Sequence, residues 1–365
     1  MNDPNQQVNI KKTLVPLSWL YGLGVRFRNL LFDCNILKQK EYKLPVICVG
    51  NLTVGGTGKT PHTEYLLRLL SEEFHTAVLS RGYKRKTKGF QLATEASTAL
   101  DIGDEPYQIK SKFPQATVAV DANRQQGIEC LLKQQHPRVE AILLDDAYQH
   151  RYVKAGMNIL LTDYNRLFCD DTLLPAGLLR EPKSGKDRAT IVIVTKCPED
   201  IKPIDFNIIG KRLDLYPFQE LYFSSLKYGS LQPIYPTQAA APISLKELST
   251  VDSILLVTGI AHPFYLKEEL SKHNDRVDCL EFKDHYQFTN RDIDAILARF
   301  NSLDGDHKLI VTTEKDAVRL QGMELPQQLK ESIFALPIQV EILQDKQTIF
   351  NQKIVDYVRK NTRNS

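Results

Sequence analysis

Residues 46–61 read VICVGNLTVGGTGKTP, and this stretch predicts the fold of the chain around it. Residues 46–49 are a short run of apolar side chains rich in β-branched residues, typical of a buried parallel strand. The nine residues that follow contain four glycines, and Lys59 and Thr60 come directly after them. Leucines at 66, 67, 69 and 70 then have the spacing of a helix. A strand, a glycine-rich loop, a Lys-Thr pair and a helix in this order indicate a phosphate-binding P-loop.

The chemistry of such a loop explains its composition. Glycines allow backbone N–H groups to turn toward phosphate oxygens, and the start of the helix adds a favourable dipole. We expect Lys59 to reach the β- and γ-phosphates and the Thr60 hydroxyl to ligate Mg²⁺. Thr53 stands where the strict pattern has glycine, so an ordinary glycine-rich turn is the alternative. The residues assigned to nucleotide binding are Asn51, Thr53, Val54, Gly55, Gly56, Thr57, Gly58, Lys59, Thr60 and Pro61.

Length and composition are those of an ordinary globular protein. The chain has 365 residues, 42% hydrophobic and 25% charged, which suffices for two domains or one large α/β unit. The formal net charge of +3 is too small to indicate a nucleic-acid partner. The six cysteines include no C-x-x-C pair, which argues against a zinc site or a disulfide framework and favours a reducing, cytosolic setting.

Six short apolar segments predict the strands of a doubly wound, mainly parallel sheet of the P-loop NTPase type. They occupy residues 46–49, 76–80, 117–120, 141–144, 158–162 and 190–195. The fourth segment runs into Asp145 and Asp146. An apolar strand that ends in aspartate downstream of a P-loop is typical of the carboxylate that holds the Mg²⁺ of a bound nucleotide. Thr60, Asp145 and Asp146 are therefore the candidate metal ligands, although an acid at a strand end can also simply cap the next turn.

The chain divides into four predicted segments. Residues 1–44 are an amphipathic N-terminal segment, and residues 45–217 the P-loop core domain. Residues 218–242 form a linker or a β-ribbon, and residues 243–365 a smaller α/β domain. Within this last segment we expect strands at 253–257, 277–282 and 309–312, and helices at 264–273 and 289–300.

An amphipathic helix is expected over residues 13–33, with lysines and arginines around it. Its apolar face holds Leu17, Leu20, Tyr21, Gly24, Phe27 and Leu31. No stretch approaches the roughly 18 apolar residues that a transmembrane helix needs, and the segment has no signal-peptide cleavage site. Two interpretations remain open from the residues alone: the helix packs on the core, or it lies on an anionic leaflet.

Three further motifs carry charged or titratable side chains. The basic loop 81–86 follows a predicted strand, at the sheet edge where α/β proteins bind ligands. Asp104 and Glu105 lie at an expected helix start, where either acid can serve merely as a cap. His285 lies in a loop and is the histidine best placed for chemistry, although a loop histidine is usually just solvated.

Seven motifs, taken in order, resemble those of the tetraacyldisaccharide 4′-kinases, the enzymes that phosphorylate the lipid A precursor. They are GNLTVGGTGKTP (50–61), SRGYKRK (80–86), GDEPYQI (103–109), LDDAYQHR (144–151), LPAGLLREP (174–182), DHYQFT (284–289) and VTTEKDAVRL (311–320). The resemblance covers residues 13–320. The chain departs from the family pattern at 147–148, where Gly-Phe is more usual than Ala-Tyr, at Leu178, where proline is common, and at Tyr286, where a second histidine often stands.

The resemblance implies transfer of the γ-phosphate of ATP, with Mg²⁺, to the 4′-hydroxyl of an acylated glucosamine disaccharide 1-phosphate, which gives lipid IVA. It implies that Asp104 takes or orients the hydroxyl proton and that His285 is its partner from the second domain. The other expected active-site residues are Glu105, Arg124, Arg180 and Glu181. It also implies peripheral attachment to the cytoplasmic face of the bacterial inner membrane, which favours the interfacial helix. We expect a monomer with no nucleic-acid partner.

Two other functions stay open at this point. A P-loop nucleotide switch or a chaperone-type regulatory NTPase also pairs a Lys-Thr loop with strand-end acids, but it has no need of Asp104 together with His285. Thr195 and Lys196 resemble part of a guanine-reading motif, yet Pro198 argues against guanine specificity. A kinase of a soluble sugar would differ in its acceptor, and the basic amphipathic N-terminus argues modestly against it.

Overall fold

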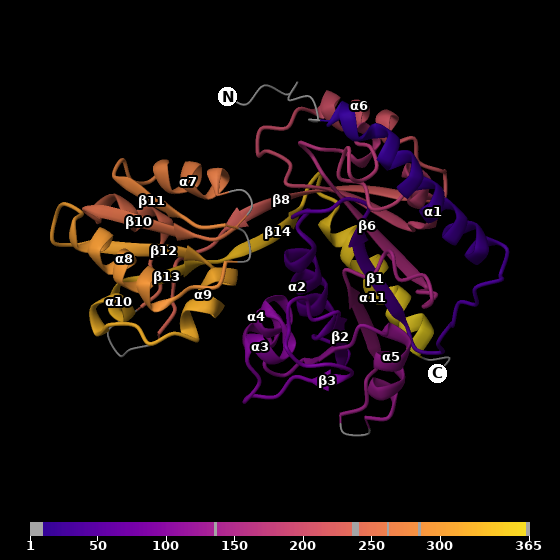
Figure 1. The fold of residues 1–365 in the computed structure, drawn as a ribbon, viewed down its shortest axis with the longest axis horizontal. Helices are drawn as coiled ribbons and strands as arrows, with labels where there is room; N and C mark the ends of the chain where they lie inside the picture. Colours follow the sequence, from indigo (N-terminus) through magenta and orange to yellow (C-terminus); the bar gives the residue numbers. More distant parts are fainter. Residues whose placement is uncertain (1–9, 135–136, 236–240, 261–262, 284–285, 363–365) are drawn as a thin grey trace. The chain divides into compact units, whose positions relative to one another are not determined.

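Two compact units make up the computed structural model, which describes residues 10–134, 137–235, 241–260, 263–283 and 286–362 (Figure 1). The first unit is built from residues 1–96, 109–226 and 340–365. The second is built from residues 97–108 and 227–339. The second unit is thus formed from two separate stretches of the chain, and one of them carries Asp104 and Glu105.

A nine-stranded sheet forms the centre of the first unit, in the order β14-β8-β7-β6-β1-β5-β2-β4-β3. The strands are β1 (Val46–Asn51), β2 (Thr76–Ser80), β3 (Gln91–Leu92), β4 (Thr117–Val120), β5 (Ala141–Asp145), β6 (Met157–Asp163), β7 (Ile191–Thr195), β8 (Glu220–Tyr228) and β14 (Ile338–Ile342). The pairs from β8 through β4 are parallel, whereas β3 pairs with β4 antiparallel.

β1 lies in the middle of this sheet, and all six of its residues are buried. It pairs with β5 on one side and with β6 on the other, and Val49 is in register with Asp145. Because the carboxyl ends of parallel strands meet at one edge of a sheet, the glycine loop after β1 and the acids after β5 lie at the same edge.

Helices surround the sheet of the first unit. They are α1 (Val15–Asp33), α2 (Lys59–Leu70), α5 (Arg124–Leu132), α6 (Pro203–Leu213) and α11 (Gln347–Thr362), with 3₁₀ turns at Lys12–Leu14, Phe168–Asp170 and Lys183–Arg188. α2 buries Leu66, Leu67 and Leu70, the leucines that repeat at helical spacing. α11 packs beside α2: the Tyr65 hydroxyl donates to Asn351 Oδ1 at 2.6 Å, and the Tyr65 and Phe350 rings lie 6.0 Å apart.

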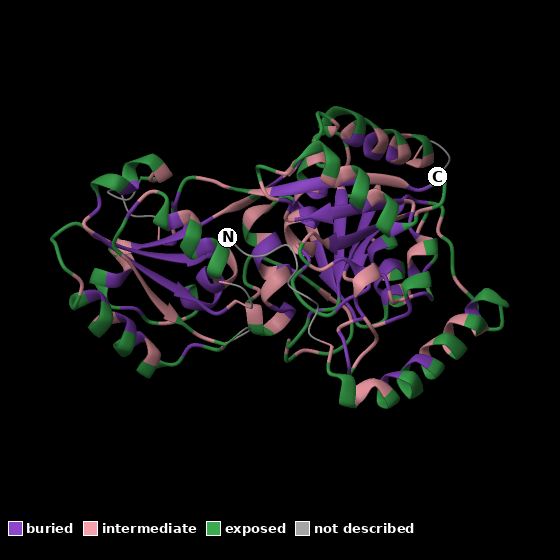
Figure 2. Ribbon diagram, turned by 90° about the horizontal axis from the view of Figure 1, so that it is seen from above, coloured by how far each residue is buried: buried purple, intermediate pink, exposed green. Residues whose placement is uncertain are grey.

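The second unit has a five-stranded sheet in the order β11-β10-β12-β13-β9. Its strands are β9 (Gln232–Pro233), β10 (Ser253–Thr258), β11 (Val277–Glu281), β12 (Lys308–Thr313) and β13 (Ile333–Leu336). Its helices are α3 (Ala99–Ile102), the first half of α4 (Asp104–Lys112), α7 (Phe264–Ser271), α8 (Asn290–Asn301), α9 (Glu314–Gln321) and α10 (Gln327–Ser332), with a 3₁₀ turn at Leu245–Thr250. The central strands β1, β5 and β7 of the first unit and β10 of the second are wholly buried, and buried residues are coloured purple in Figure 2.

The predicted α/β fold is confirmed, with a large mainly parallel sheet, a smaller second α/β unit and an N-terminal helix. All six strands expected in the core are present. The structure also differs from the expected boundaries. Residues 218–242 include β8, a strand of the large sheet, where a linker or ribbon was expected. Residues 340–365 belong to the first unit, because β14 joins the large sheet and α11 packs on α2.

Candidate active site

The glycine loop has the backbone shape that its sequence requires. Gly55 and Gly58 have φ angles of +110° and +82°, a left-handed conformation that other residues rarely adopt. Gly58 is the N-cap of α2, so Lys59 and Thr60 are the first two residues of the helix. Their backbone N–H groups belong to the first turn, where no intrahelical acceptor exists. The loop therefore presents free N–H donors and the positive end of the helix dipole together.

Buried polar side chains hold the loop from beneath. Asn51 is fully buried, and its Nδ2 donates to Thr57 Oγ1 at 2.8 Å. The Thr57 carbonyl in turn accepts from Thr195 Oγ1, at the end of β7, at 2.9 Å. Asn51 and Thr57, which are also predicted to bind the nucleotide, brace the loop through these bonds. The N–H of Val54 donates to the Leu178 carbonyl at 2.8 Å, which connects the loop to the LPAGLLREP motif (174–182).

Lys59 lies within reach of both the loop and an acid. Its Nζ donates to the Gly55 carbonyl at 3.4 Å and lies 3.9 Å from Asp146 Oδ1. Arg180 Nη1 binds the same carboxylate, at 3.1 Å from Oδ1 and 3.2 Å from Oδ2. Three residues assigned from separate motifs thus meet at one point, with two cations around one carboxylate.

Asp145 and Asp146 differ in their surroundings. Asp145 is buried at the end of β5, and its Oδ1 accepts from Thr63 Oγ1 at 3.1 Å. Asp146 follows it with a φ of +45°, and its side chain is 30% exposed. The two carboxylates thus have different partners, Thr63 for Asp145, and Lys59 and Arg180 for Asp146.

Arg124 braces the ends of two strands. It is the first residue of α5 and is almost fully buried. Its Nη1 donates to the Asp121 carbonyl at 2.7 Å, and its Nη2 reaches the Asp145 carbonyl at 3.5 Å. Burial lowers the pKa of the Arg124 guanidinium, and the nearby Asp145 and Asp146 carboxylates partly offset this effect.

Glu181 lies in the segment between β6 and β7 and is the centre of a buried charge cluster. Both of its carboxylate oxygens accept from Arg188 Nη2 at 2.9 Å, and Gln149 Nε2 donates to Oε1 at 2.9 Å. Gln149 also donates to the Asn51 carbonyl at 2.7 Å and accepts from Arg180 at 3.4 Å. Sequence reasoning missed Gln149, which joins β1, Glu181 and Arg180, although it stands inside the quoted LDDAYQHR motif.

In the second unit, Asp104 is held by an arginine that was not assigned from the sequence. Arg319 Nε and Nη2 both donate to Asp104 Oδ2, at 3.0 and 2.7 Å. The neighbouring acid Glu105 forms an ion pair with Lys315 at 3.3 Å. Arg319 and Lys315 both lie on α9, within the quoted VTTEKDAVRL motif. His285, the expected partner of Asp104, lies outside the described residues.

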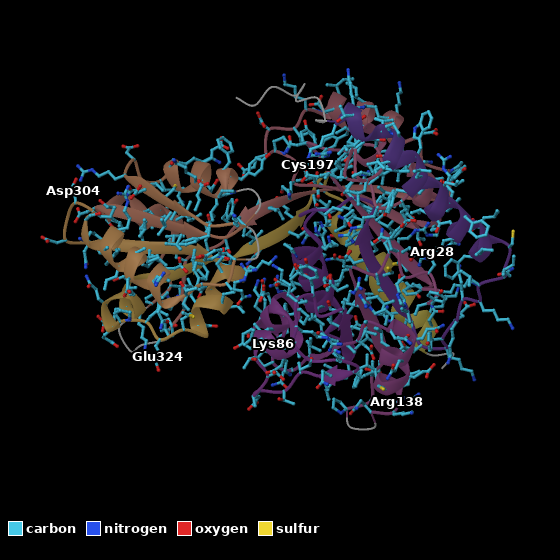
Figure 3. The ribbon with its side chains drawn as sticks, viewed as in Figure 1. Arg28, Lys86, Arg138, Cys197, Asp304 and Glu324 are labelled. Atoms are coloured by element: carbon cyan, nitrogen blue, oxygen red, sulfur yellow. The ribbon has the colours of Figure 1, made fainter. Side chains whose placement is uncertain are left out.

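The N-terminal helix packs against the unit through its small and polar side. Ser18 and Gly22 are buried, and Ser18 Oγ accepts from the Ala176 N–H at 2.9 Å. Tyr21 donates to the Arg180 carbonyl at 2.7 Å, and Arg28, labelled in Figure 3, donates to the Gln149 carbonyl at 2.9 Å. The helix is therefore attached to the candidate active site itself.

Phe32, near the end of α1, is buried, but most of the large apolar side chains of the helix face outward, contrary to the interpretation in which they pack on the core. Six of them are between 53% and 76% exposed: Leu17, Trp19, Leu20, Leu23, Phe27 and Leu30. Most of the apolar face identified from the sequence is thus exposed, although Leu31 is half-buried. Among the described residues, no helix combines the length and apolar character needed to cross a bilayer.

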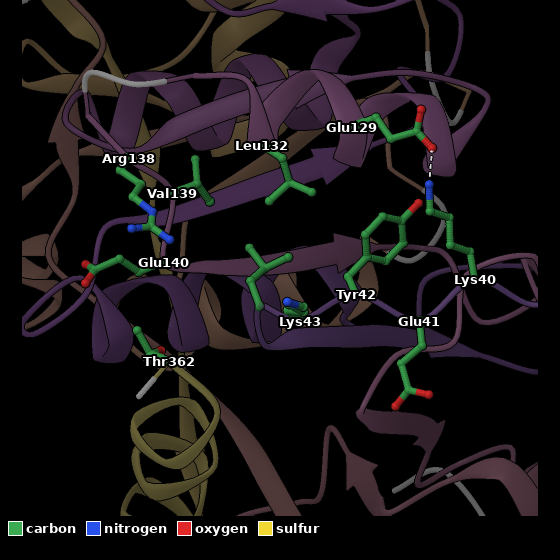
Figure 4. A pocket seen from close by; sticks show the side chains of 11 residues that line it. Lys40, Glu41, Tyr42, Lys43, Glu129, Leu132, Arg138, Val139, Glu140 and Thr362 are labelled. Atoms are coloured by element: carbon green, nitrogen blue, oxygen red, sulfur yellow. Dashed lines mark hydrogen bonds and ion pairs between the residues drawn. The ribbon is translucent and has the colours of Figure 1, made fainter. Parts of the chain in front are cut away.

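A surface pocket of about 540 Å³ lies at the opposite end of the large sheet from the glycine loop (Figure 4). Its lining includes Leu44, which precedes β1, and Glu140, which precedes β5, together with the ion pair of Lys40 and Glu129 at 2.6 Å. Because it lies at the amino ends of the strands, it contains none of the residues assigned to nucleotide binding. It is therefore not part of the candidate active site.

The chain is similar to known proteins over nearly its whole length. A family model described as tetraacyldisaccharide-1-P 4′-kinase matches residues 10–358. Tetraacyldisaccharide 4′-kinases of Bacteroides thetaiotaomicron and Bacteroides fragilis ATCC 25285 are each 60% identical to this chain, over 98% of the chain and 96% of the relative. That of Flavobacterium johnsoniae is 47% identical, over 96% of the chain and 98% of the relative.

A solved structure is also similar. It is described as the "apo" form of LpxK from Aquifex aeolicus in complex with ATP, and it matches with a TM-score of 0.72 at 27% sequence identity. The match covers 95% of this chain and 99% of that chain.

Proposed function

The chain belongs to the tetraacyldisaccharide-1-P 4′-kinase family, and on that premise we propose that it transfers the γ-phosphate of ATP to the 4′-hydroxyl of a tetraacylated glucosamine disaccharide 1-phosphate, a precursor of lipid A. The observation that supports this most directly is the meeting of Lys59, Asp146 and Arg180 at the carboxyl edge of the large sheet. A regulatory NTPase and a kinase of a soluble sugar are both set aside, because the family is defined by this acylated acceptor.

The nucleotide phosphates bind to the glycine loop. The N–H groups at the start of α2 donate to phosphate oxygens, and Lys59 neutralises charge on the β- and γ-phosphates. Arg180 binds the same Asp146 carboxylate that Lys59 approaches, and this second cation stabilises charge that develops on the transferring group. The side chains act here by placement and charge, since phosphoryl transfer leaves little covalent work to the protein.

The donor set at this edge fits Mg²⁺. The ion prefers oxygen ligands and takes one or two carboxylates together with phosphate oxygens and water. Thr60 supplies a hydroxyl, and Asp145 and Asp146 supply carboxylates at the end of the adjacent strand β5. Among the described residues, no three His, Cys, Asp or Glu side chains form a metal-binding cluster. When bound, Mg²⁺ neutralises negative charge on the phosphates.

Asp104 acts on the acceptor hydroxyl. A sugar hydroxyl is a weak nucleophile, and a carboxylate within hydrogen-bond reach can accept its proton as it attacks. Arg319 fixes one oxygen of that carboxylate. We assign His285 as a second partner of Asp104 on the strength of the family motif alone. Glu105, held by Lys315, is assigned to the same acceptor side of the reaction.

The protein works as a peripheral enzyme at the cytoplasmic face of the inner membrane. An acceptor with four acyl chains partitions into lipid, so the enzyme has to reach it at the interface. The exposed apolar side chains of α1 and nearby cations such as Lys11, Lys12 and Arg26 have the composition of an interfacial helix. Because α1 is bonded to the Arg180 segment, insertion of its apolar face brings the reacting edge to the lipid.

Product formation from labelled ATP tests the proposal. The protein is incubated with γ-labelled ATP, Mg²⁺ and tetraacyldisaccharide 1-phosphate in mixed micelles, and the lipid fraction is analysed for a bisphosphorylated product. We expect labelled lipid, and ATP consumption that depends on the lipid acceptor. ATP hydrolysis at the same rate with and without lipid would instead support the regulatory NTPase, and phosphorylation of a deacylated disaccharide alone would support the soluble-sugar kinase.

A further inference from the structure

His62 connects the glycine loop to a distant strand of the large sheet. It lies one turn into α2 and is 2% exposed. Its Nδ1 is 2.7 Å from the carbonyl oxygen of Gly58, and its Nε2 is 2.9 Å from Ser224 Oγ on β8. The two bonded residues are separated by 166 positions in the sequence (224 − 58). The histidine was not among the residues assigned from the sequence.

The two hydrogen bonds determine where the imidazole carries its proton. A carbonyl oxygen can only accept, so Nδ1 must carry the proton and donate it to Gly58. Nε2 is then unprotonated and accepts from the Ser224 hydroxyl. Burial favours this neutral ring, because it lowers the pKa of His62 to about 4 from an ordinary value of 6.5. The ring is therefore a fixed connector with one donor end and one acceptor end.

The bond to Gly58 also orients the next residue's N–H. The Gly58 carbonyl and the Lys59 N–H belong to one planar trans peptide, so they point in opposite directions. When His62 holds the carbonyl toward the protein, the Lys59 N–H is directed away from it, out of the first turn of α2. The His62 backbone N–H also donates to the Gly58 carbonyl, at 3.2 Å, so the ring supplies a second and shorter hydrogen bond to the same oxygen. Gly58 itself has no Cβ and a φ of +82°, so it does little to restrain this peptide.

We propose that His62, anchored by Ser224, is a positioning residue for ATP: it sets the orientation of the Gly58–Lys59 peptide that binds the nucleotide phosphates. The inference rests on the proposed function in that it requires ATP to bind the glycine loop. It goes beyond that function by assigning the preorganisation of the loop to a residue outside the P-loop motif and to a serine on β8.

A role confined to packing makes a different prediction. A histidine that merely fills the core would affect stability, and ATP affinity would follow stability. A positioning histidine affects ATP affinity in protein that remains folded, and it leaves the affinity for the lipid acceptor alone. The two nitrogens can also be replaced separately, because an asparagine amide at position 62 can still donate to Gly58 from close to the Nδ1 position but cannot reach Ser224.

The experiment compares four variants of the full chain. His62→Leu removes both bonds, His62→Asn keeps the bond to Gly58, and Ser224→Ala removes the anchor. The control is His75→Leu, which removes another histidine–hydroxyl bond of the same unit, from His75 Nε2 to Thr117 Oγ1 at 2.8 Å. His75 directly precedes β2, at the sheet edge away from the loop. For each protein the dissociation constant of Mg²⁺-ATP, the KM of the lipid acceptor and the thermal midpoint are measured.

We expect His62→Leu to weaken ATP binding about 3- to 10-fold, the usual effect of losing one or two neutral hydrogen bonds, with the acceptor KM unchanged. We expect His62→Asn to stay within about twofold of wild type and Ser224→Ala to lie between the two. The proposal is overturned if folded His62→Leu binds ATP like wild type, if His75→Leu loses as much affinity, or if His62→Asn is as weak as His62→Leu. If His62→Leu does not fold, the same comparison between His62→Asn and Ser224→Ala decides. Wild-type protein that fails to bind ATP would contradict the proposed function instead.

Discussion

Arg319 donates two hydrogen bonds to the same carboxylate oxygen of Asp104: Nε lies 3.0 Å and Nη2 2.7 Å from Oδ2. The arginine is itself fixed, because its Nη1 donates to Asp316 at 2.7 Å and its side chain is only 3% exposed. Asp316 is held in turn by the Gly259 N–H and the Thr313 hydroxyl, both at 2.8 Å. A buried chain of charge-assisted hydrogen bonds therefore determines the position of the carboxylate to which we assign the acceptor proton.

Replacement of Asp104 or Arg319 should separate chemistry from ATP binding. We expect Asp104→Ala to abolish transfer while ATP binding is largely kept, because Asp104 is not part of the phosphate-binding loop. We expect Arg319→Ala to lower kcat about 10- to 100-fold, since a displacement of a reacting group by about 1 Å can lower the rate about 100-fold. Arg319→Lys should recover part of this loss, because lysine keeps the charge but not the forked geometry. Single-turnover kinetics at saturating ATP measures each rate.

Arg299 offers a matched control for Arg319. It also pairs with an aspartate in the second unit, through Nη2 to Asp278 Oδ1 at 3.0 Å, but it is exposed. Exposed ion pairs contribute little to stability, and Arg299 does not contact Asp104. Arg299→Ala should therefore leave kcat unchanged. Near-normal turnover of Asp104→Ala would show that Asp104 does not take the acceptor proton. Equal losses of kcat in Arg319→Ala and Arg299→Ala would show that Arg319 does not position Asp104.

Lys59 should contribute to both ATP binding and rate, because it lies between the loop and Asp146. We expect Lys59→Ala to raise the dissociation constant of ATP and to lower kcat by about 10² or more, since a preorganised charge at the transferring phosphate stabilises the transition state. Titration with a fluorescent ATP analogue and steady-state kinetics measure the two effects. Lys154→Ala, which removes an exposed pair with Glu41, is the control. A loss of affinity with kcat intact would restrict Lys59 to ground-state binding.

The parts of the fold that sequence reasoning predicted are those specified locally. Each of the six predicted core strands is a continuous apolar run, and its pattern is visible within a few residues. β14 and α11 were not predicted as parts of the first unit. After the second unit the chain returns to the large sheet, and nothing local in the sequence indicates this return. Helical spacing at Phe350, Ile354 and Val358, all buried, was the available signal for α11.

The site shows the same division between local and distant information. The glycine loop, Lys59 and the Asp145–Asp146 pair were identifiable because each motif is contiguous. The roles of Arg319 and His62 could not be predicted, since their partners Asp104 and Ser224 are 215 and 162 positions away. The bond from buried Asn51 to Thr57 could not be predicted either, because it depends on burial rather than on residue type.

The exposed apolar face of α1 should control membrane binding. We expect the double variant Leu20→Glu, Phe27→Glu to bind vesicles containing anionic lipid at least 10-fold more weakly, because each apolar side chain contributes about 1.5–3 kcal/mol when buried. The KM for the acylated acceptor should rise as well. Vesicle flotation measures the first effect. Both side chains are more than 60% exposed, so the fold should tolerate the changes.

A control for membrane binding comes from α6, whose Ile204 and Ile208 are 58% and 47% exposed. The double variant Ile204→Glu, Ile208→Glu removes a similar amount of exposed apolar surface from the same unit. It should bind vesicles like wild type. Unchanged flotation of the α1 variant, or an equal loss in the α6 variant, would contradict an interfacial role specific to α1.

The buried neutral state of His62 should make stability depend on pH. Its pKa is about 4 in the folded chain and 6.5 as its ordinary value, so between these values the unfolded chain binds a proton that the folded chain does not. Stability therefore falls as pH falls from 6.5 toward 4, by about 1.4 kcal/mol per pH unit at most and about 3 kcal/mol in total. Above pH 6.5 this contribution is fully present and constant.

Comparison of wild type with His62→Leu isolates this effect, because the remaining titratable groups are common to both proteins. We expect the free energy of unfolding of wild type to drop by about 2 kcal/mol more than that of His62→Leu between pH 7 and pH 5. Urea unfolding at the two pH values, followed by circular dichroism, measures the difference. His150, whose pKa burial also lowers to about 4, contributes equally to both and cancels. A parallel pH dependence in the two proteins would mean that His62 gains a proton in the folded chain near its ordinary pKa, and that its ring cannot be the neutral connector between Gly58 and Ser224.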